Sequence, residues 1–373
     1  MAHAYTPGLK VAEADVVRKE RRLPLKGEVI VSVGDTVNAD QIVARTELPG
    51  NVQTINVAGR LGCVPADIVE FMLKSEGDTA KEGEPIAETK GFFGFLKTRI
   101  PAPCDCTIES ISEITGQVIL REPPIPVQVD AYVDGKIVDI YEGEGIAVET
   151  YAAFIQGIFG IGGETKGGIM KVSSSPDEVL TEKEVPEECA GRILIGGSMV
   201  TAGAVKEAIK RKAAGIVAGG MDDEDLKVFL GYELGVAITG SEDIGTTVII
   251  TEGFGKMRMA DKTFNLLVSH EGQRASMNGA TQIRAGVIRP EIVVPLHKEG
   301  KAVSSKESAE GLVIGSPIRV IREPYFGILG KVTGLPSELE NIETEAKVRV
   351  LEVELADGRK ALLPRANVEI IEG

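Results

Sequence analysis

An internal repeat constrains the fold of this chain more than any other feature of its 373 residues. The stretch VGDTVNADQIVARTE (33–47) matches EGDTAKEGEPIAETK (76–90) at an offset of 43 residues, with the Gly-Asp pair in common. Residues 101–119 match a later stretch at an offset of 29, and in this alignment Asp105 corresponds to Asp134. In each stretch a turn leads into alternating apolar and polar residues, which is typical of a β-strand. These duplicated turns predict that the first third of the chain folds back on itself as paired β halves.

The repeated motifs resemble the barrel-sandwich hybrid fold of biotinyl and lipoyl carrier domains, which also occurs in non-carrier versions in electron-transport complexes and RNA polymerase subunits. The resemblance covers residues 25–150 and implies a lipoyl-like, β-rich domain. In a carrier, a lysine at a short hairpin tip holds the cofactor, and Lys90 stands near that position. Here the tip, TKGFFGFLKTR, is long and carries three phenylalanines, while Glu47 takes the equivalent place in the first copy. We therefore expect a non-carrier domain without a cofactor, with covalent attachment at Lys90 as the open alternative.

From residue 191 the pattern changes to short apolar runs that end in glycine or threonine and alternate with helical stretches. This alternation predicts a small α/β domain over residues 191–297 with a mostly parallel sheet. The carboxyl ends of parallel strands meet at one edge, where ligands bind and helix N-termini offer free N–H groups. The candidate ligand-binding residues at this edge are Gly197, Ser198, Thr201, Gly219, Gly220, Asp222, Asp223, Thr239, Gly240, Glu242, Thr251 and Glu252. Alternatively, these loops need glycine and threonine only for tight turns.

The C-terminal stretch, residues 311–373, predicts short strands joined by turns, with Asp357-Gly358 as a two-residue hairpin. Its segment YFGILGKV (325–332) resembles a KOW motif on an SH3-like barrel, as in NusG-type elongation factors and several ribosomal proteins. The resemblance implies RNA or protein as a partner. Eight basic and ten acidic residues give this stretch a charge of −2, which favours protein because phosphate-binding surfaces are usually basic. The candidate contact residues are Arg319, Arg322, Tyr325 and Phe326.

Composition disfavours several classes of function. A net charge of −15 disfavours a broad grip on nucleic acid, and we expect no reading of DNA sequence. Four cysteines in so long a chain do not indicate a disulfide framework, and Cys104 and Cys106 would supply only half of a zinc site. Three scattered histidines do not indicate a metal site either. No window approaches the ~18 apolar residues of a membrane span, and the first residues lack an apolar signal core, so we expect a cytoplasmic protein.

We therefore expect a multidomain α+β protein in which no catalytic set is evident. Its expected parts are an N-terminal arm (1–24), the β-rich barrel-sandwich hybrid domain (25–150), a glycine-rich connector with an acidic loop (151–190), the α/β domain (191–297) and the SH3-like β-barrel (311–373). The first hypothesis is a non-enzymatic scaffold or assembly protein that binds a protein partner or itself, with a small-ligand pocket in its α/β domain. The alternatives are a factor associated with RNA, transcription or translation that acts through the KOW barrel, and a carrier or accessory subunit of an enzyme complex.

Overall fold

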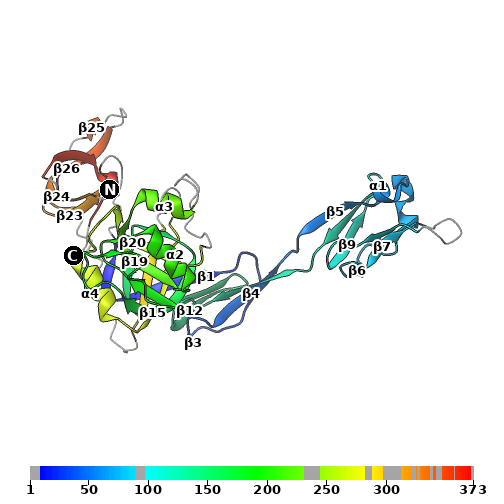
Figure 1. Cartoon of the computed structure of the whole chain (residues 1–373), viewed down its shortest axis with the longest axis horizontal. Helices are drawn as coiled ribbons and strands as arrows, with labels where there is room; N and C mark the ends of the chain where they lie inside the picture. The colour runs from blue at the N-terminus through cyan, green and yellow to red at the C-terminus, as the bar shows by residue number, and fades with distance from the viewer. Residues whose placement is uncertain are drawn as a thin grey trace.

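The computed structural model describes residues 9–89, 97–230, 244–281, 288–296, 312–320, 325, 328–336, 339–341, 347–356 and 358–370. Strands dominate these residues, in agreement with the expected β-rich class. Figure 1 shows an elongated molecule in which a large body carries a small C-terminal sheet on one side. A separate β module stands at the far end of a narrow stalk on the other side, and its chain comes from the first third of the sequence.

The body is built on a sheet of 13 strands in the order β14-β20-β19-β17-β15-β21-β22-β13-β12-β3, with β1, β16 and β18 paired off this path. Its strands are β1 (Val11–Arg22), β3 (Thr36–Val37), β12 (Gly135–Tyr141), β13 (Gly145–Gln156), β14 (Phe159–Ile161), β15 (Glu164–Lys171), β16 (Val179–Leu180), β17 (Arg192–Ile195), β18 (Met199–Val200), β19 (Gly215–Met221), β20 (Thr247–Phe254), β21 (Arg274–Asn278) and β22 (Glu291–Pro295). The neighbours β15, β17, β19 and β20 run parallel. Antiparallel strands extend the sheet on both sides of them.

Helices cover both faces of the parallel part. Strand β19, with the sequence GIVAGGM, is buried at every position, as expected of a parallel strand enclosed on both faces. One face packs against α2 (Ala202–Lys210) and α3 (Asp223–Leu230), and the other packs against α4 (Asp261–Ser269). The parallel sheet predicted for this region is therefore present, although it forms one part of a larger mixed sheet.

The glycine-rich stretch before residue 191 differs from the expected connector, because it supplies strands to the same sheet. It contains the end of β13, then β14 and β15, and β15 pairs in parallel with β17. Its glycines permit close approach of neighbouring backbones. A Cβ on Gly160 would lie 2.7 Å from the carbonyl oxygen of Gly279, and one on Gly167 would lie 2.5 Å from that of Gly191. Glycine here serves tight packing inside the body rather than a flexible link.

The first third of the chain forms two β modules, one inserted within the other. The proximal module, residues 28–48 and 125–148, contains β2 (Glu28–Val29), β3, β4 (Ile42–Leu48), β11 (Ile125–Asp130), β12 and the start of β13. The distal module, residues 52–121, contains β5 (Val52–Asn56), α1 (Val57–Leu61), the short helix η1 (Pro65–Glu70), β6 (Thr79–Ala80), β7 (Pro85–Glu88), β8 (Arg99–Pro101), β9 (Cys106–Ile111) and β10 (Gln117–Arg121). The distal module has its own cluster of buried apolar side chains, whereas the cluster of the proximal module also includes Val17, Phe154 and Val293 of the body. The single unit expected over residues 25–150 is thus divided in two.

The two modules share a set of turn contacts at the sequence offsets of the repeat. In the proximal module the Gly34 amide donates to the Ile137 carbonyl, and in the distal module the Gly77 amide donates to the Ile108 carbonyl, each at 2.8 Å. In each module, a carboxylate from the second half then accepts a hydrogen bond from the next turn of the first half. Asp134 Oδ1 accepts from the Ala39 amide at 2.7 Å, and Asp105 Oδ1 accepts from the Glu82 amide at 2.9 Å. The offsets of 43 and 29 residues therefore relate one module to the other.

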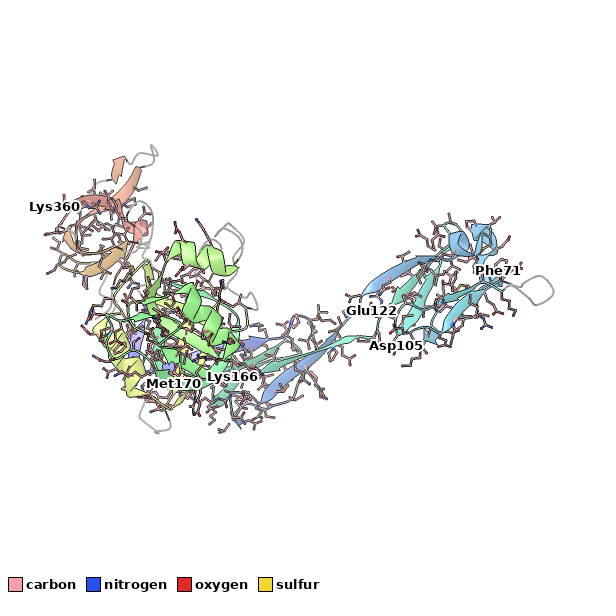
Figure 2. All side chains as sticks on the ribbon, in the orientation of Figure 1. Phe71, Asp105, Glu122, Lys166, Met170 and Lys360 are labelled. Carbon is pink, nitrogen blue, oxygen red and sulfur yellow. The ribbon has the colours of Figure 1, made fainter. Side chains whose placement is uncertain are left out.

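A neck of residues 49–51 and 122–124 joins the modules. The chain leaves the proximal module after β4 and returns at β11, where Leu48 and Ile125 are paired neighbours. Within the neck a Cβ on Gly50 would lie 1.9 Å from the carbonyl oxygen of Glu122, so only glycine fits this crossing. Figure 2 shows Glu122 and Asp105 at the neck end of the distal module and Phe71 at its opposite end.

Ion pairs fasten the proximal module to the body. The Arg274 guanidinium on β21 lies 2.6 Å from a carboxylate oxygen of Asp40, and the Lys166 ammonium on β15 donates to the Ala39 carbonyl at 2.7 Å. Arg21 of β1 also links the two, because its Nε donates to the Asp130 carbonyl of β11 at 2.9 Å while its guanidinium contacts both carboxylate oxygens of Glu164 on β15, at 2.6 and 2.7 Å. The turn at Ala39 and Asp40, which Asp134 binds within the module, is thus also bound by Lys166 and Arg274 of the body.

The C-terminal sheet, residues 317–370, has six strands in a separate antiparallel sheet. They are β23 (Pro317–Val320), β24 (Leu329–Gly334), β25 (Leu339–Asn341), β26 (Lys347–Leu355), β27 (Lys360–Pro364) and β28 (Val368–Ile370), with a short helix η2 (Arg365–Asn367). β26 and β27 pair antiparallel, which confirms a hairpin at this place, but the hydrogen bond from the Leu355 amide to the Arg359 carbonyl leaves three residues between the strands rather than the predicted two, and Asp357 lies outside the described residues. Their alternating apolar side chains, such as Leu351, Val353 and Leu363, fill the core of this unit.

Candidate functional site

The carboxyl edge of the parallel strands, where a ligand was expected, is covered by other parts of the chain. The Ser198 hydroxyl donates to the carbonyl of Asp177 at 2.7 Å, so the polar loop after β15 lies over the end of β17. A Cβ on Gly197 would come within 2.4 Å of the Glu178 carbonyl oxygen. Thr201 instead caps α2, because its hydroxyl oxygen accepts from the Ala204 amide at 3.2 Å. These three residues hold the protein's own loops together.

The end of β19 is also covered by another segment of the chain. Cβ atoms on Gly219 and Gly220 would lie 2.0 Å from the Met257 carbonyl oxygen and 2.1 Å from that of Gly255. The segment that follows β20 therefore crosses directly over these glycines. Asp222 accepts a hydrogen bond from the Glu224 amide at 3.0 Å, where α3 begins with Asp223. The remaining candidates before β20 lie outside the described residues: Thr239, Gly240 and Glu242.

Two candidates from different parts of the sequence bind each other. The carboxylate of Glu252, at the end of β20, forms a buried ion pair with the guanidinium of Arg319 on β23 of the C-terminal sheet. Glu252 is 5% exposed and Arg319 is 3% exposed. Arg319 also donates to the Thr251 carbonyl at 3.2 Å, and Glu252 accepts from the Ala260 amide at 3.0 Å. The edge is thus closed by the C-terminal sheet, and Arg319 is engaged inside the protein rather than presented to phosphate.

Of the other contact residues expected in the C-terminal unit, Tyr325 is described. Tyr325 is half-buried, and the Arg359 guanidinium lies over its ring at 5.2 Å. Arg322 and Phe326 lie outside the described residues, as does Lys90.

A pocket lies at the opposite, amino edge of the parallel strands. Its volume is about 590 Å³, within the usual range for ligand pockets of about 300–1,000 Å³. It is lined by Gly163, Glu164, Thr165, Ile209, Lys212, Ala213, Ala214, Ile244, Gly245, Thr246 and Thr247. The pocket forms where β15 begins well before its neighbour β17, so that residues 164–167 pair with β21 on one side and have no β17 partner on the other.

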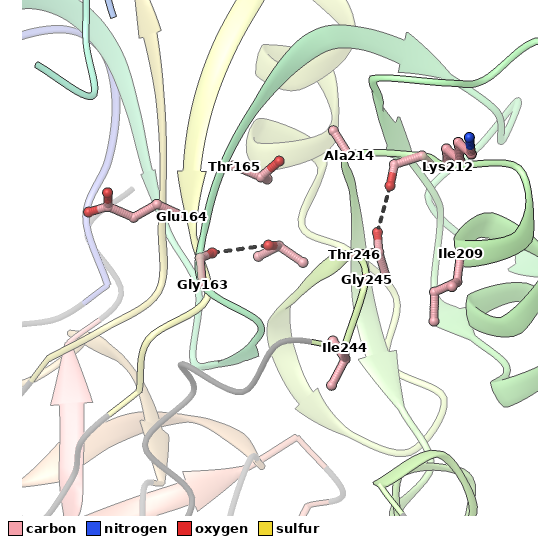
Figure 3. Close-up of a pocket in the computed structure, with 11 residues that line it drawn as sticks. Gly163, Glu164, Thr165, Ile209, Lys212, Ala214, Ile244, Gly245 and Thr246 are labelled. Carbon is pink, nitrogen blue, oxygen red and sulfur yellow. Dashed lines mark hydrogen bonds between the residues drawn. The ribbon is translucent and has the colours of Figure 1, made fainter. Parts of the chain in front are cut away.

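Few side chains of this pocket are available to a ligand. The Thr246 hydroxyl donates to the Ala213 carbonyl and the Thr247 hydroxyl donates to the Gly163 carbonyl, each at 3.0 Å. Dashed lines mark these hydrogen bonds in Figure 3. Glu164 is held by Arg21, and in Figure 3 its carboxylate points away from the other lining residues. The pocket is therefore lined by backbone, by apolar side chains and by Thr165 and Lys212. Sequence reasoning missed it because nothing local indicates where a strand begins relative to its neighbour.

The distal module carries exposed apolar side chains at the end that lies away from the neck. Val64, Val69 and Ile114, here called the tip patch, are 63%, 52% and 91% exposed. They come from two segments that pack together, since the Ala58 amide of α1 donates to the Gly116 carbonyl at 3.0 Å. A sequence signal existed in Ile114, an apolar residue between Glu113 and the turn at Thr115-Gly116, but its exposure could not be read from it.

No helix in the described part of the chain is long and apolar enough to cross a membrane. Comparisons with protein-family models and with curated proteins find no match to this chain.

Proposed function

We propose that this protein is a non-enzymatic assembly protein that presents its distal module, on the neck, to a separate protein partner. The observation that carries the proposal is the tip patch, because its residues are exposed and come from segments next to α1, which Figure 1 shows at the outer end of the distal module. Exposed apolar side chains that cluster on one surface are typical of interaction sites. A module with its own core can hold such a surface rigid while the neck sets its distance from the body.

The charge of the distal module supports a partner rather than a second copy. Residues 52–121 contain seven basic and ten acidic residues, a net charge of −3. Two copies of an acidic module repel each other, whereas a partner with an apolar centre and a basic rim is attracted to it. The proposed partner is therefore a protein of that character.

The rest of the molecule serves as the platform in this proposal. The buried pair of Glu252 and Arg319 fixes the C-terminal sheet to the body, and Arg274 and Asp40 fix the proximal module to it. We propose that both modules are of the non-carrier barrel-sandwich hybrid type and that the C-terminal sheet is an SH3-like unit of the KOW type. The paired halves of each module support the first assignment. The six antiparallel strands support the second.

Site-specific photo-cross-linking in the native host tests the proposal. A photoreactive amino acid at Ile114 is expected to give a discrete adduct with a protein partner, and the same probe at Lys81 is the control. Lys81 is exposed on the same module and pairs with Asp105 near the neck end. Adding Val64→Asp should abolish the Ile114 adduct, and higher salt should reduce it because opposite charges attract across the rim.

The outcomes separate the proposal from its rivals. Identical adducts from both positions, or an Ile114 adduct that survives Val64→Asp, would mean that the tip patch is not a specific docking surface. An adduct only with a second copy of this chain would replace the partner by self-association. Hydrogen exchange on the Val64→Asp variant verifies that the distal module remains folded.

A further inference from the structure

A pair of thiols meets at the neck end of the distal module, and the proposed docking role does not use it. Cys104 and Cys106 flank Asp105 in the turn that leads into β9. The two thiols are close enough for each to influence the pKa of the other, and Gln53 Nε2 of β5 donates to Cys104 Sγ at 3.5 Å. Figure 2 shows that Asp105 lies close to the neck. The two thiols therefore lie close together in one short turn of the module.

The proximal module shows that this turn does not need cysteine. Its equivalent turn has Val133 and Gly135 on either side of Asp134. Asp134 and Asp105 make the same hydrogen bond to the facing turn, so the backbone arrangement is shared. Val133 is buried, and a Cβ at Gly135 would lie 2.3 Å from the Glu149 carbonyl oxygen. The distal module therefore carries a dithiol where its sister module carries inert residues.

The two thiols differ in their access to solvent. Cys104 is partly exposed, whereas Cys106 is 4% exposed and belongs to the core of the module. An exposed thiol beside a buried one is the arrangement of an attacking and a resolving cysteine. Because only one residue separates them, the disulfide closes a very small ring and should be reduced readily.

We propose that Cys104 and Cys106 form a reversible dithiol–disulfide couple that exchanges with small disulfides. Cys104 loses its proton and attacks a sulfur of the small disulfide, which releases one thiol and leaves a mixed disulfide on Cys104. The Cys106 sulfur then attacks Cys104 Sγ, which breaks the mixed disulfide and releases the second thiol. The protein loses two electrons and two protons, and the small disulfide gains both.

The charged surroundings set the pH dependence of this exchange. Burial raises the pKa of both thiols, and for Cys104 the carboxylates of Glu122, Glu82 and Asp105 act in the same direction. Lys81 faces Asp105 at 2.9 Å and partly offsets that charge. Since the thiolate is the attacking species, exchange should speed up as pH rises from neutral toward the raised pKa of Cys104.

The test uses the full chain and oxidised glutathione. The protein is incubated with it, quenched with acid, alkylated, and analysed by intact mass and peptide mapping. We expect two of the four thiols to be lost, both mapped to Cys104 and Cys106, with no glutathione retained and with full recovery after dithiothreitol. The Cys106→Ser variant should keep one glutathione on residue 104, because the resolving thiol is gone. The Cys104→Ser variant should leave Cys106 fully alkylated after unfolding.

Other outcomes would overturn the proposal. These are all four thiols remaining free, glutathione retained on the unmodified chain, or Cys104 paired with Cys63 or with a second chain. The Cys63→Ser variant is the matched control and should react like the parent protein. Circular dichroism of each serine variant shows whether the module is folded. The chain with its four native cysteines gives a decisive thiol count even where a variant does not fold.

Discussion

The Arg319 guanidinium of the C-terminal sheet lies against the Glu252 carboxylate at the end of β20, and both side chains are buried. The two residues are 67 positions apart in sequence and belong to different sheets. Their pairing closes the edge of the parallel strands and fixes the C-terminal sheet on the body. The sequence had suggested Glu252 as a ligand contact and Arg319 as a partner contact, and in the structure they bind each other.

Breaking this pair should weaken the attachment of the C-terminal sheet. Arg319→Leu leaves the Glu252 carboxylate buried without its partner, and Glu252→Leu does the same to Arg319. Each should lower the free energy of unfolding by about 3–5 kcal/mol. The double variant should cost less than the sum of the two, because no isolated charge remains. Urea unfolding of all four proteins measures this, and additive costs would show that the pair is not coupled.

The shared turn contacts of the modules predict two local and separate effects. Asp105→Ala removes the acceptor of the Glu82 amide, and Asp134→Ala removes that of the Ala39 amide. Hydrogen exchange followed by mass spectrometry should show faster exchange around residue 82 only in the first variant and around residue 39 only in the second. Each variant serves as the control of the other. Faster exchange in both modules from a single change would mean that they are not independent units.

The crossing of the neck predicts a strong preference for glycine at one position. Gly50→Ala places a Cβ against the Glu122 carbonyl and should destabilise the molecule by about 1–3 kcal/mol through overpacking. Gly163→Ala is the matched control, since a Cβ there meets nothing within 4 Å. It should change stability by no more than about 0.5 kcal/mol. Equal effects in urea unfolding monitored by circular dichroism would contradict the close approach at the neck.

The junction of the proximal module with the body predicts a shifted titration. The hydrogen bond from Arg274 is the main cause that lowers the pKa of Asp40 below its ordinary value. The stabilisation is present above the ordinary carboxyl pKa and is lost as pH falls through the lowered one. Arg274→Gln should raise the pKa of Asp40 back toward the ordinary value, as measured by NMR titration of the aspartate carboxyl carbons. An unchanged titration would mean that the contact is not formed in solution.

Much of the local structure could be predicted from sequence. The Gly-Asp turns, the alternation of strand and helix after residue 191 and the hairpin between β26 and β27 all depend on neighbours in the chain. The repeat also aligned Asp105 with Asp134, and in the structure each carboxylate accepts from the facing turn of its module. These features follow from backbone preferences that short stretches of sequence encode.

What could not be predicted depends on long-range choices. The repeat shows which stretches are alike but not which halves pair, so the insertion of the distal module between β4 and β11 was hidden. The glycines of β15 indicate close approach or a flexible link equally well, and only the neighbouring backbone decides. The pocket depends on how far β15 extends beyond β17, and the partnership of Glu252 depends on where the C-terminal sheet docks.

Small-angle X-ray scattering on two proteins tests the central claim, that the distal module stands away from the body. The first is the full chain, and in the second an Asn-Gly turn replaces residues 49–124, so that Leu48 and Ile125 remain hairpin neighbours. The account predicts a long tail in the distance distribution of the full chain, which the shortened protein loses while its body keeps its own shape. A compact distribution for the full chain, or an unchanged maximum dimension after the replacement, would contradict it.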